Sequence, residues 1–115
     1  MRSVSRIAGL VLAATVLSAC GGAEEGAFDD PVLEVTIEAG QVEPRDQELA
    51  MPAGVPIDVR ITSDRPGELH FHARPSRTIS FVPGTTTGEV QFDAPGVVKV
   101  EEHLSGMTVA QPEMR

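Results

Sequence analysis

The sequence predicts an all-β protein, an antiparallel sandwich or barrel of about seven strands, that follows a signal peptide and a flexible tether. Three observations predict this fold. Short runs alternate apolar with polar side chains, turn-forming residues separate these runs roughly every dozen residues, and no segment carries the apolar stripe of an amphipathic helix.

Residues 1–19 have the layout of a secretory signal peptide. Arg2 and Arg6 precede an uninterrupted run of apolar and small residues over positions 7–16. A helix needs about 20 apolar residues to cross a bilayer, so this run is too short for a permanent transmembrane span. We therefore expect the segment to be removed after export.

Cys20 closes this segment. Residues 17–21 read Leu-Ser-Ala-Cys-Gly, which resembles the lipobox of bacterial lipoproteins. The resemblance implies cleavage before Cys20 and a lipid on its sulfur, so that the chain is anchored to a cell membrane and faces the extracytoplasmic side. The alternative is an ordinary buried or free cysteine. The position at the end of the apolar run favours lipidation, because processing requires a cysteine there.

The charge after cleavage makes nucleic acid an unsuitable partner. Residues 20–115 carry 7 basic and 17 acidic side chains, a formal charge of −10, with four Phe, no Tyr and no Trp. Nucleic-acid binding needs clustered cations and, for single strands, aromatic platforms. An acidic balance either favours cations or keeps the protein soluble. Charge alone leaves both of these open.

The chain divides into three parts: the signal peptide 1–19, a lipidated tether 20–30 that is small, acidic and without periodicity, and one domain over 31–115. The alternation in that domain predicts half-buried strands. Its apolar positions are Leu33, Val35 and Ile37; Ile57, Val59 and Ile61; Leu69 and Phe71; Ile79 and Phe81; Val90 and Phe92; and Val98 and Val100. Residues 41–50 are poorly patterned, which leaves an irregular strand, a loop or a short helical turn open.

Two of the three histidines share a strand. His70 and His72 flank Phe71, so their side chains leave the same strand face with Cα atoms about 6.5 Å apart, a spacing from which two imidazoles reach one ion. A third imidazole, His103, and the thioether of Met107 follow in a late loop. Such a set favours copper, with zinc as the alternative if a carboxylate joins instead.

Residues 32–110 resemble the cupredoxin-like domains of small exported bacterial proteins. The resemblance lies in the first strand with Gly-Gln-Val-Glu-Pro at 40–44, in the turn and strand over 52–64, in Glu-Leu-His-Phe-His at 68–72, and in the closing segment 92–103. It implies a Greek-key β-sandwich. It also places His70 near the first histidine ligand of the family, His103 near the later one and Met107 near the axial ligand.

One position departs from the blue-copper pattern. The resemblance implies a cysteine six residues beyond Gly96, where this sequence has Glu102. Without a thiolate there is no blue copper centre, so we expect no electron transfer of that kind. Glu102 shares the parity of Val98 and Val100 and is expected to point inward, where a carboxylate needs a histidine, a metal or an arginine as its partner.

The sequence also lacks the common catalytic motifs. It has no Gly-x-Ser-x-Gly elbow, no phosphate-binding loop and no His-Glu-x-x-His. We therefore expect a protein that is not an enzyme. The first hypothesis is a cupredoxin-like lipoprotein that binds copper or another transition metal through His70, His72, His103 and Met107. The alternative is a metal-free interaction module that contacts another envelope protein.

Overall fold

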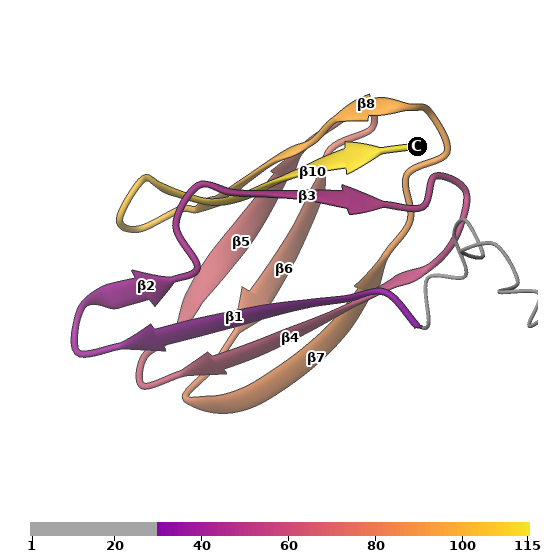
Figure 1. Cartoon of the computed structure of the whole chain (residues 1–115). Coiled ribbons are helices and arrows are strands. Elements are labelled where there is room, and N and C mark those ends of the chain that lie inside the picture. Colours follow the sequence, from indigo (N-terminus) through magenta and orange to yellow (C-terminus); the bar gives the residue numbers. More distant parts are fainter. Residues whose placement is uncertain (1–29) are drawn as a thin grey trace, which may run out of the picture.

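Two β-sheets packed face to face enclose the apolar core of the computed structural model, which describes residues 30–115 (Figure 1). Sheet A contains, in spatial order, β2 (Gln41–Glu43), β1 (Val32–Glu38), β4 (Ile57–Ser63) and β7 (Gly84–Val90). Sheet B contains β3 (Gln47–Met51), β10 (Met107–Met114), β9 (Lys99–Glu102), β5 (Gly67–His72) and β6 (Arg77–Phe81), with β8 (Gly96–Val97) paired to β10. The predicted signal peptide and Cys20 lie outside the described residues.

The all-β prediction is confirmed, with two corrections. The described residues form ten strands rather than about seven. Their pairing is not wholly antiparallel either, because β1 runs parallel to β4 and β3 runs parallel to β10. Parallel neighbours arise because the chain crosses from one sheet to the other between these strands, a connection that sequence alternation does not reveal. Within residues 30–115 the structure contains no helix that could span a membrane.

The alternating side chains bury as the sequence predicts. In β4 every second residue is buried, and Val59 and Ile61 are inaccessible to solvent. Leu69 and Phe71 of β5 likewise point into the core, while His70 and His72 point the other way. This alternation matters for the site, because it places the two histidines on the outer face of sheet B.

Most of the difference between the predicted and observed numbers of strands has two sources. Two strands lie within the poorly patterned segment, and one lies at the C-terminus. Residues 41–50 contribute β2 and most of β3. The missed C-terminal strand, β10, contains a register shift between Thr108 and Ala110, and the adjacent Val109 and Ala110 are both buried. A bulge of this kind breaks the period of two. Pro112 also weakens a strand prediction, since it has no N–H to donate.

A tight turn joins β1 to β2. Ala39 and Gly40 both have positive φ angles, 50° and 75°, and the flanking Glu38 and Gln41 are paired. Two central residues with positive φ give the tight hairpin turn that matches the twist of the strands. The Ala39 N–H also donates to the Asp64 carboxylate at 2.7 Å, so the turn between β4 and β5 supports this one.

Candidate metal site and a buried ion pair

Glu102 lies between the two sheets and is fully buried. It stands opposite Leu69 in the pairing of β9 with β5, and both side chains point inward. The Arg65 guanidinium donates to both carboxylate oxygens, from Nη2 to Oε2 at 3.1 Å and from Nη1 to Oε1 at 3.3 Å. The backbone N–H groups of Leu104 and Ser105 donate to the same carboxylate at 3.2 and 2.8 Å. The inward orientation predicted for Glu102 is thus observed, and its partner is an arginine.

These hydrogen bonds fix the charge of Glu102. Burial alone would raise its pKa, but the bonds from Arg65, Ser105 and Leu104 outweigh burial and lower the pKa of Glu102 from 4.5 to about 2. The bond with Glu102 raises the pKa of Arg65 further above its ordinary value. Both groups are therefore charged throughout the neutral range, and the pair is satisfied without a metal.

The turn between β4 and β5 holds Arg65 in this position. The Arg65 N–H donates to Ser63 Oγ at 3.1 Å, and the Ser63 hydroxyl donates back to the Arg65 carbonyl at 2.6 Å. Gly67 completes the turn where a side chain would not fit, because a Cβ there would lie 2.5 Å from the Phe81 ring. The sequence Ser-Asp-Arg-Pro-Gly at 63–67 thus directs the guanidinium inward.

His70 and His72 form the second cluster, on the outer face of β5. Their rings stack with centroids 4.5 Å apart and planes 25° from parallel. His70 is half-buried and His72 is exposed. The prediction that they share one face is borne out.

Glu101 of β9 lies beside this pair. It stands directly opposite His70 in the strand register, and Lys99 stands opposite His72. Glu101 Oε2 lies 2.8 Å from Lys99 Nζ and 3.6 Å from His72 Nε2. The hydrogen bond from Lys99 is the largest of the effects that lower the pKa of Glu101. The cluster therefore combines two imidazoles with an ionised carboxylate.

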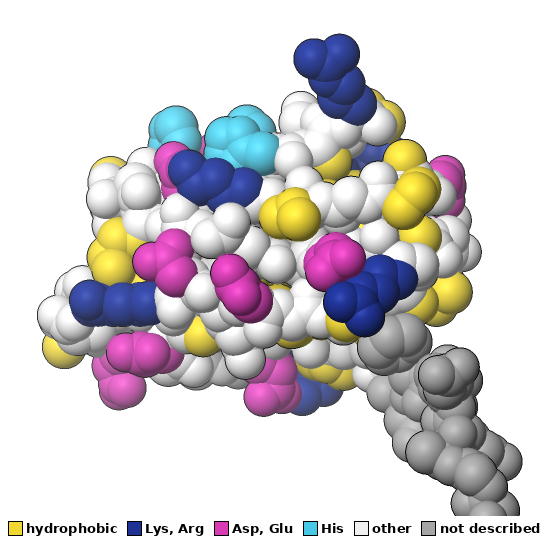
Figure 2. Space-filling view, turned by 45° about the horizontal axis from the view of Figure 1, so that its top comes forward, with side chains coloured by type: hydrophobic (Ala, Val, Ile, Leu, Met, Phe, Trp, Pro, Cys, Tyr) yellow, Lys and Arg dark blue, Asp and Glu magenta, His cyan; other side chains and the backbone are white. Residues whose placement is uncertain are grey.

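His103 follows directly after β9, and Met107 is the first residue of β10. His103 is exposed in the loop after β9, where its N–H donates to the Glu68 carbonyl at 3.0 Å and its side chain borders an open hollow of about 430 Å³. Figure 2 shows the histidine side chains at the surface, with basic and acidic side chains beside them. Met107 is paired with Glu102 and packs against the core. The structure thus stacks His70 against His72 and turns Met107 towards the core, while His103 lies beside Glu68, two residues before His70.

No three potential ligands converge in the structure as it stands. Among residues 30–115, no group of three or more His, Cys, Asp or Glu side chains is placed to hold a metal ion. Arg65 and Glu101 were not among the site residues predicted from the sequence. Side chains alternate along β9, so the alternation that directs Glu102 inward also directs Lys99 and Glu101 outward. The outward direction of Glu101 could therefore have been predicted from the sequence. No local pattern points to Arg65, which is 37 residues from Glu102.

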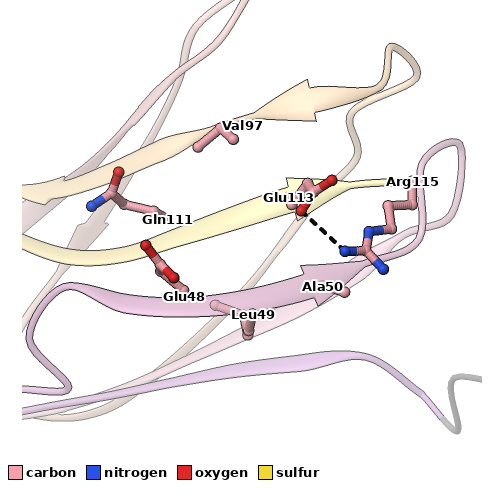
Figure 3. A pocket seen from close by; sticks show the side chains of 7 residues that line it. All are labelled: Glu48, Leu49, Ala50, Val97, Gln111, Glu113 and Arg115. Carbon is pink, nitrogen blue, oxygen red and sulfur yellow. Dashed lines mark hydrogen bonds and ion pairs between the residues drawn. The ribbon is translucent and has the colours of Figure 1, made fainter.

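The hollow in Figure 3 is a separate feature. It has a volume of about 390 Å³ and lies over β3, β8 and β10. Its lining residues are Glu48, Leu49, Ala50, Val97, Gln111, Glu113 and Arg115. The Arg115 guanidinium donates to the Glu113 carboxylate at 3.2 Å, so these two charged side chains of the hollow already pair with each other.

Comparison with solved structures places this architecture among copper proteins. The chain superposes on a multicopper oxidase from Pediococcus acidilactici with a TM-score of 0.55 and 16% identity, covering 76% of this chain and 27% of that one. It superposes on a heme-copper terminal oxidase dimer structure with a TM-score of 0.56 and 19% identity, covering 88% of this chain and 78% of that one. A purple cupredoxin from Nitrosopumilus maritimus gives 0.46 with 16% identity, covering 70% of this chain and 99% of that one.

These likenesses concern the fold alone. The chain spans about a quarter of the length of the multicopper oxidase that it matches. No protein-family model matches the sequence, and no curated protein matches it either. The fold is therefore a cupredoxin-like β-sandwich of the kind found in copper proteins.

The described residues do not fit a blue copper centre. Such a centre needs a thiolate with two imidazoles, and the only cysteine of the chain is Cys20, in the N-terminal segment. At the position where the resemblance implies the thiolate, Glu102 is bonded to Arg65. The inward neighbour across the strand pair is Leu69, while His70 faces outward. An ion pair thus occupies the position where the resemblance implies the thiolate.

Proposed function

We propose that this protein is an extracytoplasmic cupredoxin-like lipoprotein, anchored to the cell membrane by lipid on Cys20, that binds a transition-metal ion through His70 and His72. The metal is copper in the first instance and zinc in the second. The protein stores, delivers or senses the ion and does not act as an enzyme. The observation that carries the proposal is the pair of imidazole rings 4.5 Å apart on one accessible strand face.

The chemistry of this pair suits reversible metal binding. Neutral imidazole is a common ligand of both copper and zinc. The His72 side chain is 47% exposed, so an ion reaches it from solvent without any opening of the fold. A site on an open strand face also exchanges its ion more readily than a closed one, which suits delivery better than electron transfer.

A titration tests the proposal. Residues 21–115 contain every core residue and leave out the Cys20 thiol, which would itself bind copper. We expect this fragment to bind one Cu(II) or Zn(II), and the His70→Ala/His72→Ala variant to lose that binding. Affinity is also expected to fall on acidification, because protons compete with the metal for imidazole nitrogen. His103→Ala is the matched control and should bind like the wild type.

Two results would reject metal binding by this pair. One is the absence of binding to the wild-type fragment. The other is equal binding by the wild type and the double variant. Circular dichroism of the double variant is the accompanying control, and we expect it to be unchanged because His72 is exposed and His70 is only half-buried.

The alternative function is a metal-free interaction module of the cell envelope. The end of the sandwich near His103 favours it, because Leu104 is 71% exposed there and, with Phe81 and Pro66, borders the hollow of about 430 Å³. An exposed leucine beside a hollow offers a partner an apolar contact. Elemental analysis of the protein purified from its native envelope separates the two functions, since a stoichiometric metal argues against the module.

A further inference from the structure

Glu101 occupies a position that the proposed histidine pair alone does not explain. Directly opposite residues on one face of two antiparallel strands have Cβ atoms about 5 Å apart, and Glu101 is the residue opposite His70. Its carboxylate oxygen is also 3.6 Å from His72 Nε2. The glutamate therefore contacts one histidine and faces the other across the strand pair.

We propose that Glu101 is the third ligand of the metal site, and that Lys99 competes with the metal for its carboxylate. This inference rests on the proposed function, because it assigns a further donor to the same site. His70, His72 and Glu101 would then bind one ion on the outer face of β5 and β9, with the remaining positions open to solvent.

The donor set also selects the ion. Two imidazoles and a carboxylate suit divalent ions such as Zn(II) and Cu(II), whereas Cu(I) prefers thiolates and thioethers. Met107 is paired with the inward-facing Glu102 and packs against the core. The Met107 thioether therefore faces the core and not the histidine pair, where a Cu(I) ion would need it. The site is expected to prefer divalent ions over Cu(I).

Binding requires movement of surface side chains only. In the present arrangement the imidazoles stack against each other, and Glu101 is bonded to Lys99 at 2.8 Å. A metal ion would replace the Lys99 ammonium as the cation beside Glu101, and at least one ring would turn to direct its nitrogen to the ion. An exposed ion pair such as this one contributes little stability, so opening it costs little. The backbone register already holds the three residues side by side.

A double-mutant cycle on residues 21–115 tests the assignment, with Zn(II), Cu(II) and Cu(I) as probes. Glu101→Gln keeps the size of the side chain and removes its charge, and we expect Zn(II) affinity to fall by about tenfold or more with little change for Cu(I). Lys99→Gln is expected to raise Zn(II) affinity about two- to fivefold. Glu89→Gln, on β7 of sheet A, removes the same charge away from the site and is the matched control.

The cycle separates ligation from a general effect of charge. If Lys99 competes for Glu101, the gain from Lys99→Gln disappears in the Glu101→Gln background. An equal gain in both backgrounds, or equal losses in Glu101→Gln and Glu89→Gln, overturns the role of Glu101 and leaves the histidine pair intact. A wild-type fragment that binds no metal overturns the proposed function itself. The Cu(II) spectrum gives an independent readout, because loss of a ligated oxygen alters it while loss of a distant charge does not.

Discussion

Glu101 and Glu102 are consecutive residues of β9, and their surroundings are opposite in kind. Glu102 points between the sheets, is fully buried and is held by a guanidinium and two backbone N–H groups. Glu101 points outward beside two imidazoles and bonds to a flexible lysine. One step along the strand therefore separates a carboxylate that stabilises the fold from one that is free to change partners. We therefore expect Glu102 to contribute mainly to stability and Glu101 mainly to metal binding.

The largest expected effect is the loss of the arginine on the inner side. Arg65→Ala leaves the Glu102 charge buried without its guanidinium, and we expect it to lower the free energy of unfolding by about 3 to 5 kcal/mol. Arg60→Ala, which breaks the exposed pair with Glu34, should cost less than about 1 kcal/mol. Urea denaturation of the two variants measures both values. Similar values for the two would remove the contrast between inner and outer pairs.

The next effect is the acid sensitivity of the inner pair. The pKa of Glu102 is lowered from 4.5 to about 2, so this group stabilises the fold above the ordinary glutamate pKa and the stabilisation is lost as pH falls from about 5 to 2. The difference corresponds to about 3 kcal/mol. We expect Glu102→Gln to lose this part of the pH dependence of unfolding. Identical pH dependence in wild type and variant would contradict it.

A smaller effect is expected on the outer side, and only when the ion is present. An ion that binds the folded protein raises the free energy of unfolding by about 2.7 kcal/mol at 100 times its dissociation constant. Thermal unfolding with and without Zn(II) should show this rise for the wild type and not for His70→Ala/His72→Ala. The same rise in both proteins would place the bound zinc elsewhere.

The smallest expected effect is that of Glu101 on stability without metal. Glu101→Gln removes only an exposed ion pair with Lys99, so we expect the free energy of unfolding to change by less than about 0.5 kcal/mol. Glu102→Gln, one residue further, should cost several times more because the partly buried Arg65 guanidinium loses its counter-charge inside the fold. Urea denaturation of this pair of variants compares adjacent carboxylates directly. Comparable losses would mean that Glu101 also serves the fold.

Much of the fold was predictable because alternation is a local signal. The buried positions of β1, β4 and β5 follow the period of two, and so does the shared outer face of His70 and His72. The signal failed at β10, where two consecutive residues are buried at a bulge. It was also silent on β2 and β3, which are short or have no clear alternation. Prediction from pattern was therefore good where strands are regular.

The candidate site was predictable only in part. The inward direction of Glu102 followed from its parity with Val98 and Val100, and histidine, metal and arginine remained open as its partner. The fold selected Arg65, which arrives from a turn 37 residues earlier. His103 and Met107 were grouped with the histidine pair by residue type and then through the resemblance, but among residues 30–115 no three potential ligands are placed to hold one ion. Met107 instead packs against the core.

The sequence by itself determined which side chains share a strand face, because a strand alternates its side chains whatever it pairs with. The order of residues also predicts an export signal and a lipidated Cys20. Only the tertiary structure decided which strand lies beside which, and therefore that Glu101 stands opposite His70 and that Leu69 stands opposite Glu102. Strand register depends on the packing of the whole sandwich, and no segment encodes it alone.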